Sequence, residues 1–189
     1  SQRISDEYQV DCEFKLCDIT DESQISKVRD SLLSKFGHID ILINNAAIDP
    51  KVEKDTTKNL SRLENISLKQ WNLEIAVGLT GAMLCSKIFG SEMVKRGEGV
   101  ILNISSDLGI IAPDQRIYKK EGLPENEQPV KPVTYSVIKH GLIGLTKYLA
   151  TYWPGKVRCN ALCPGGIYAD QPKDFVQRLT DLIPLGRMA

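Results

Sequence analysis

A tyrosine and a lysine four positions apart are the side chains of this 189-residue sequence best placed for proton transfer. Tyr135 and Lys139 lie in a stretch with helical spacing, so both side chains share one face of a helix. A free phenol has a pKa of about 10, but a nearby ammonium group can lower it by about 1–3. Tyr135 is therefore a candidate proton donor to a carbonyl, or acceptor from an alcohol. The alternative is an exposed Tyr/Lys pair on a helix surface.

Three further short patterns stand where strands are expected to end, and they hold small or polar side chains. They are Asn44-Asn45-Ala46-Ala47, Ile104-Ser105-Ser106 and Cys163-Pro164-Gly165-Gly166-Ile167. A hydroxyl such as that of Ser106 can hydrogen-bond a reacting oxygen, and small residues let the backbone approach a ligand. Ligands of open α/β sheets bind at the carboxyl ends of the strands, so we expect these patterns to meet at one site.

The surrounding segments alternate between short apolar runs and longer helical patterns. Runs typical of strands span residues 14–19, 39–44, 100–105 and 156–163. Helical patterns span residues 20–37, 67–95 and 134–152, and a last one begins at Pro172. The alternation predicts an α/β fold whose parallel sheet has helices on both faces, with residues 39–44 buried on both sides. Thr20 and Ser67 are the expected N-caps, and Gly37 the expected stop of the first helix.

Two long polar stretches interrupt this alternation, at about residues 48–66 and 107–132. Loops of such length in a compact domain are usually functional or disordered. The second stretch begins directly after Ser106, so it can lie over a substrate, and its mixed charges favour a polar ligand. The alternative is a flexible surface excursion.

Composition excludes several classes of partner. Lys plus Arg and Asp plus Glu both number 24, which argues against nucleic-acid binding through a basic surface and against a polybasic membrane anchor. No apolar run approaches the roughly 18 residues of a membrane helix, and the N-terminal stretch lacks the apolar core of a signal peptide. The five cysteines form no C-x-x-C pair and the histidines are two. We therefore expect a reduced, cytoplasmic protein with no metal site.

Taken in order, the patterns resemble those of the short-chain dehydrogenase/reductase family, over about residues 17–189. The resemblance implies one Rossmann-type, doubly wound domain over residues 1–189 that uses NAD or NADP. It also implies an incomplete sheet, because the family's glycine-rich phosphate loop is not found in this sequence. Residues 14–19 match the family's third strand, so its first two strands are expected before Ser1 and its last strand after Ala189.

The resemblance also assigns roles to individual residues. Ser106, Tyr135 and Lys139 match the catalytic residues, with Tyr135 as general acid–base. Cofactor contacts are implied for Asp18, Ile19, Asn45, Ala46, Ala47, Tyr135, Lys139, Pro164, Gly165 and Ile167. The sequence departs from the family at Gly78, where most members carry an asparagine that holds a water of the proton relay, and at Ala169, where a threonine is frequent.

The expected function is hydride transfer between a nicotinamide and the carbonyl or alcohol carbon of a small polar substrate, with a sugar-derived one among the candidates. Two alternatives stay open. A dinucleotide-binding protein with weak or no turnover is suggested by Gly78 and Ala169, and a sugar-nucleotide dehydratase or epimerase by residues 107–132. Family members commonly form homodimers or homotetramers, and we expect one of these here, with no nucleic-acid or membrane partner.

Overall fold

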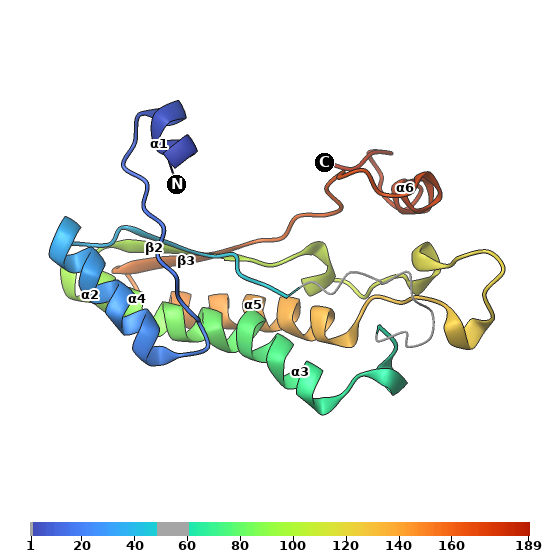
Figure 1. The fold of residues 1–189 in the computed structure, drawn as a ribbon, viewed down its shortest axis with the longest axis horizontal. Coiled ribbons are helices and arrows are strands. Elements are labelled where there is room, and N and C mark those ends of the chain that lie inside the picture. The colour runs from blue at the N-terminus through green and yellow to red at the C-terminus, as the bar shows by residue number, and fades with distance from the viewer. Residues whose placement is uncertain (1, 49–60) are drawn as a thin grey trace.

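The computed structural model of the chain describes residues 2–48 and 61–189, which form a parallel sheet with helices packed on it (Figure 1). The strands, in spatial order, are β1 (Ile41–Asn44), β2 (Gly99–Ile104) and β3 (Val157–Leu162). Both neighbouring pairs are parallel, with Asn44 opposite Asn103 and Ile104 opposite Leu162. The strands therefore end along one edge of the sheet, which confirms the predicted Rossmann-type α/β arrangement.

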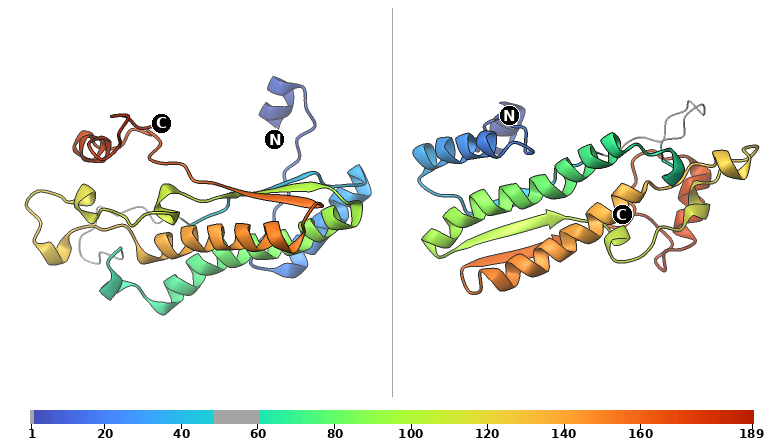
Figure 2. Two further views of the ribbon diagram at one scale, coloured as in Figure 1. Left: turned by 180° about the vertical axis from the view of Figure 1, so that it is seen from behind. Right: turned by 90° about the horizontal axis from the view of Figure 1, so that it is seen from below.

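Within the described residues, six α-helices accompany the strands: two precede β1 along the chain, three connect successive strands and one follows β3. They are α1 (Gln2–Tyr8), α2 (Glu22–Phe36), α3 (Leu68–Ile75), α4 (Gly81–Arg96), α5 (Val133–Tyr152) and α6 (Lys173–Thr180). Figures 1 and 2 show α2, α4 and α5 side by side on one face of the sheet. The expected burial of residues 39–44 on both faces is wrong, since Ile41 and Ile43 are 62% and 57% exposed. Successive strand residues point to opposite faces, and these two point away from the three helices.

The core lies between the sheet and these helices, with α4 at its centre. Met93 of α4 and Ile101 of β2 are fully buried against Leu149 of α5, and Ile25 of α2 packs on the other side of α4. Burial of each such side chain contributes about 1.5–3 kcal/mol. The stretch Leu68–Arg96 is long and apolar enough to cross a membrane by length and composition, which inspection of apolar runs missed because small polar residues interrupt it. Half of its most apolar window is buried inside the protein, as in a core helix.

The predicted helix ends are mostly confirmed. Gly37 ends α2 with φ 77°, and the Ser67 hydroxyl accepts the Gln70 backbone N–H at 3.1 Å. The cap of α2 is Asp21 and not Thr20, because the Asp21 carboxylate accepts the backbone N–H groups of residues 23 and 24. The Thr20 hydroxyl instead donates to the carboxylate of Asp18.

The strand expected at residues 14–19 does not form. Phe14 and Leu16 are 75% and 88% exposed, in a stretch of irregular backbone. A strand needs a neighbour for its backbone hydrogen bonds, and within the described ranges none lies beside this segment. Only its end, at Cys17 and Ile19, packs against the cluster between α2 and α4.

The polar stretch at residues 107–132 is folded on itself, which favours its functional interpretation. It holds three short 3-10 turns, η4 (Asp107–Gly109), η5 (Gln115–Tyr118) and η6 (Glu125–Glu127). At its centre the buried Gln128 carboxamide accepts the Lys120 backbone N–H and donates to the carbonyls of Lys120 and Leu123, at 2.6–3.0 Å. Of the other stretch, residues 49–60 lie outside the described residues, and a 3-10 turn, η2, spans Leu63–Asn65.

Candidate active site

The end of β2 is bound to the first turns of α5, and this brings the predicted catalytic residues together. The Ser105 hydroxyl donates to the Lys139 backbone carbonyl at 2.8 Å, and Lys139 Nζ donates to the Ile104 carbonyl at 2.8 Å. The ammonium of Lys139 then lies 5.5 Å from the centroid of the Tyr135 ring. The spacing of four residues therefore places cation and phenol on one helix face, as predicted.

A cavity of about 420 Å³ lies at this edge of the sheet. Six of the predicted site residues line it: Ser106, Tyr135, Lys139, Pro164, Gly165 and Ile167. They come from the loop after β2, from α5 and from the loop after β3. Side chains of residues 107–132 and of α6 complete the lining. The structure thus brings these six residues to one cavity, while their catalytic and cofactor roles stay predictions.

The remaining predicted cofactor residues do not line this cavity. Asn45, Ala46 and Ala47 are exposed directly after β1, at the same edge of the sheet. The Asp18 carboxylate accepts the backbone N–H and the hydroxyl of Thr20 at 2.9 and 2.7 Å, and these bonds lower its pKa. Asp18 therefore serves the turn before α2. Ile19 packs against α4, where a Cβ on Gly81 would lie 2.7 Å from its side chain.

The first asparagine of the Asn-Asn-Ala-Ala pattern has a structural role. Asn44 Nδ2 donates to Asn103 Oδ1 at 2.8 Å and to Ser86 Oγ at 3.0 Å. Asn103 in turn donates to Thr146 Oγ1 of α5 at 2.8 Å. This buried polar chain fixes β1, β2 and two helices to one another beneath the strand ends.

Asp107 is the site residue that sequence reasoning missed. The Ser106 hydroxyl donates to its carboxylate at 2.7 Å, and the Leu108 backbone N–H donates to the same oxygen at 2.7 Å. The Asp107 backbone N–H donates to the Pro164 carbonyl at 2.9 Å, which links the loops after β2 and β3. An acid directly after a serine pair is a signal for a local hydrogen-bonded turn, and here that turn orients the Ser106 hydroxyl.

Gly78 lies in a π-helical turn, η3 (Ala76–Thr80), between α3 and α4. Such turns are frequent at functional sites. A Cβ on Gly78 would lie 2.9 Å from a methyl carbon of Ile138, the residue before Lys139. The helix pair is therefore built around a glycine, and a longer side chain meets the core next to the site.

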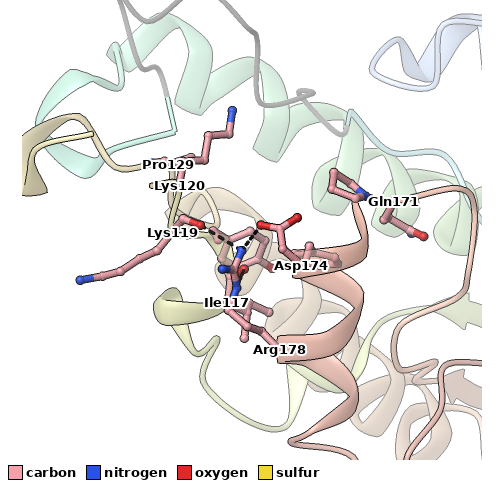
Figure 3. Close-up of a pocket in the computed structure, with 10 residues that line it drawn as sticks. Ile117, Lys119, Lys120, Pro129, Gln171, Asp174 and Arg178 are labelled. Carbon is pink, nitrogen blue, oxygen red and sulfur yellow. Dashed lines mark hydrogen bonds and ion pairs between the residues drawn. The ribbon is translucent and has the colours of Figure 1, made fainter. Parts of the chain in front are cut away.

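A second cavity, of about 460 Å³, lies beside the first, between α6 and residues 107–132 (Figure 3). Arg178 of α6 donates to the carbonyls of Ile117 and Lys119 at 3.1 and 2.9 Å and pairs with Asp174 at 2.6 Å (Figure 3). The rings of Tyr118 and Phe175 also meet, with centroids 5.5 Å apart. Ile117, Tyr118, Gln171 and Phe175 line both cavities. Helix α6 and residues 107–132 therefore cover the candidate site together, and residues 107–132 are named the roof segment, or roof.

Within residues 2–48 and 61–189, no three His, Cys, Asp or Glu side chains gather in a way that would hold a metal ion.

The chain matches two family models. The model described as short chain dehydrogenase matches residues 2–118, and the one described as Enoyl-(Acyl carrier protein) reductase matches residues 125–189. The chain belongs to the short-chain dehydrogenase family.

Individual relatives agree with this assignment. D-threitol dehydrogenase from Mycolicibacterium smegmatis is 30% identical over 181 residues, which are 92% of this chain and 59% of that protein. The crystal structure of a short chain dehydrogenase from Leptospira borgpetersenii with bound NAD+ has a TM-score of 0.78 and 34% identity, over 94% of this chain and 63% of that one. The structure of ElxO with NADP bound has a TM-score of 0.75 and 25% identity, over 100% of this chain and 71% of that one. The chain thus spans about three fifths of the length of the curated relatives that it matches.

Proposed function

We propose that this short-chain dehydrogenase interconverts an alcohol and a carbonyl in a small polar substrate, with NAD or NADP as hydride carrier. The observation that carries the proposal is the meeting of Ser106, Tyr135 and Lys139 at one cavity, at the strand ends of a parallel sheet. Relatives support it, since one of them is named for a sugar alcohol and two solved structures hold NAD+ or NADP.

Each of the three side chains has a distinct task in this reaction. Tyr135 gives its phenolic proton to the substrate oxygen during reduction and takes it back during oxidation. Lys139, whose ammonium lies 5.5 Å from the ring centroid, favours the phenolate form. The Ser106 hydroxyl hydrogen-bonds the reacting oxygen, and Asp107 holds that hydroxyl until the substrate arrives.

The residues around the cavity fit a nicotinamide group. A cavity of about 420 Å³ lies in the size range of cofactor sites, and Gly165 leaves its wall free of a side chain. Lys139, Gly165 and Ile167 would hold the nicotinamide end, while Asn45, Ala46 and Ala47 lie further along the same strand-end edge. When bound, the nicotinamide supplies or accepts the hydride.

Deuterium transfer tests this proposal directly. The full-length protein is incubated with NADH or NADPH deuterated on the nicotinamide, and with a panel of ketoses and keto acids. The expected result is deuterium on the new carbinol carbon of at least one product. Ser106→Ala, which removes one hydroxyl, should slow the transfer while the cofactor still binds. Cofactor binding without transfer to any substrate would instead support the alternative of a dinucleotide-binding protein.

A further inference from the structure

A second lysine faces the ring of Tyr135, and it comes from the roof segment at residues 107–132. Lys131 Nζ lies 3.6 Å from the ring centroid, closer than the ammonium of Lys139 at 5.5 Å. Both distances are within the range of about 6 Å over which a cation is attracted to an aromatic face. Lys131 also lines the 420 Å³ cavity together with Ser106. The proposed proton-transfer residue is therefore flanked by two ammonium groups.

The backbone of Lys131 is held from both sides. The side chain of Gln115, in η5, accepts the Lys131 backbone N–H at 2.8 Å and donates to its carbonyl at 3.5 Å. Pro132 follows with φ −58° as the N-cap residue of α5. The position of Lys131 thus follows from the fold of the roof segment, and its ammonium reaches the cavity from a fixed backbone.

The charged side chains that line the cavity include two ammonium groups, which favour an anionic ligand. Three of the described residues that line it are charged: Asp107, Lys131 and Lys139. Asp107 lies on the strand side, where one carboxylate oxygen already accepts from the Ser106 hydroxyl and the Leu108 N–H. Lys139 Nζ is directed to the Ile104 carbonyl at the end of β2. Lys131 stands at the other end of residues 107–132, two positions before α5, and its ammonium lies over the ring of Tyr135.

We propose that Lys131 binds the carboxylate of the substrate, and that the substrate is a small hydroxy acid or its keto form. This inference rests on the proposed function and names its substrate class. A charge-assisted hydrogen bond between an ammonium and a carboxylate is about twice as strong as a neutral one, and a partly enclosed cavity screens it less than water does. A hydroxy acid bound in this way presents its alcohol to Tyr135 and Ser106 and its carboxylate to Lys131.

Two ligands that differ in one group test the proposal. D-gluconate and D-glucitol have the same number of carbons, and the first has a carboxylate where the second has a hydroxymethyl group. Their affinities are measured by calorimetry in the full-length Tyr135→Phe protein with NAD+ or NADP+ bound, because phenylalanine keeps the ring under Lys131 and slows turnover by about 10²–10⁴-fold. We expect D-gluconate to bind at least about tenfold more tightly. Lys131→Gln should abolish this preference, and Lys131→Arg should keep most of it.

Lys120→Gln is the matched control, because Lys120 belongs to the same segment but lines the neighbouring cavity. It should leave the preference for D-gluconate unchanged. Equal affinities for the two ligands, no binding of D-gluconate, or a preference that survives Lys131→Gln would each overturn the proposal. A pH profile of turnover that moves in Lys131→Gln, with the preference intact, would likewise overturn it and make Lys131 a positioning residue that acts on Tyr135. Failure of deuterium transfer in the unsubstituted protein would instead count against the proposed function itself.

Discussion

Two regions of the molecule meet at the candidate site, and they are held in place by different kinds of bond. On one side, α5 carries Tyr135 and Lys139, and Ser106 follows the end of β2. These residues are positioned by the pairing of β2 with β3 and by the regular hydrogen bonds of a long helix. On the other side lies the roof segment at residues 107–132, which has only short turns. Its shape depends on side chains that bind backbone groups, above all Gln128 within the segment and Arg178 from α6.

This difference shows which part of a site a sequence motif can predict. A regular element converts sequence spacing into geometry, so the four-residue step from Tyr135 to Lys139 fixes their shared face. In the roof, a single glutamine or arginine determines the path of the backbone, and its partners lie at irregular distances along the sequence. We therefore expect substitutions in the first region to change the chemical step, and substitutions in the second to change substrate affinity.

Tyr135→Phe should have the largest effect. The substitution keeps the ring and removes the proton, and general acid–base catalysis contributes about 10²–10⁴-fold, so kcat should fall by that factor while NAD(P) still binds. Tyr148→Phe is the control, since Tyr148 lies on the same helix, is 59% exposed and stacks on Tyr152. If Tyr135→Phe retains more than about a tenth of the original kcat, Tyr135 is not the general acid–base.

Most of the scaffold could be predicted from the sequence. The apolar runs and caps predicted β1, β2, β3, α2 and α5, because each has its own local pattern. They also predicted one helix over residues 67–95, which the structure divides into α3, the π-helical turn η3 and α4. The prediction of a strand at residues 14–19 was wrong because a strand depends on more than its local pattern. An apolar run becomes a strand only beside a partner strand, and Phe14 is exposed here. The role of Asp107 depends on a contact between two loops, which no spacing rule reports. Lys131 precedes α5, so helical spacing does not predict its contact with Tyr135.

Gly78→Asn should lower kcat several-fold and also lower the free energy of unfolding, by about 1–3 kcal/mol, as overpacking of a core usually does. The new Cβ would lie 2.9 Å from a side-chain methyl of Ile138, so either that side chain or the helix turn next to Lys139 has to shift. Gly144→Ala is the matched control, because a Cβ there meets nothing within 4 Å and alanine favours a helix. A several-fold rise in kcat for Gly78→Asn would contradict this prediction. It would show that glycine at this position costs activity and that an asparagine amide restores the proton relay.

Gln128→Ala should act on the roof and leave the chemical step nearly intact. The buried carboxamide satisfies the backbone of Lys120 and Leu123, and each buried group left without a partner costs about 1–3 kcal/mol. We expect KM to rise several-fold, kcat to change little, and amide exchange to speed up within residues 107–132. Gln177→Ala, which removes an exposed glutamine of α6, should change neither KM nor exchange in the roof. A fall in kcat as large as that of Tyr135→Phe would contradict the separation of the two regions.

The smallest effect should come from two half-buried carboxylates, one at the start of α2 and one in the roof. The pKa of Asp21 is lowered from 3.8 to about 2, first by the Ser23 hydroxyl and then by the Gln24 side chain, at the start of α2. The pKa of Asp114 is lowered from 3.8 to about 2 by the Arg116 guanidinium, in the roof. A pKa that is lower in the folded protein means stability that is present above the ordinary value and is lost as the pH falls toward the lowered one.

Both groups therefore stabilise the protein at neutral pH and cease to do so between pH 3.8 and about 2. They should differ in what is lost, because Asp21 caps the helix that carries the buried Ile25, whereas Asp114 serves only the turn at η5. Asparagine caps a helix about as well as aspartate, so Asp21→Asn should flatten the acid dependence of Tm with little change at neutral pH. Asp114→Asn should leave that dependence unchanged and speed up amide exchange in the roof alone. If Asp114→Asn flattens the Tm curve as much as Asp21→Asn does, the roof unfolds together with the sheet, and the two regions form a single cooperative unit.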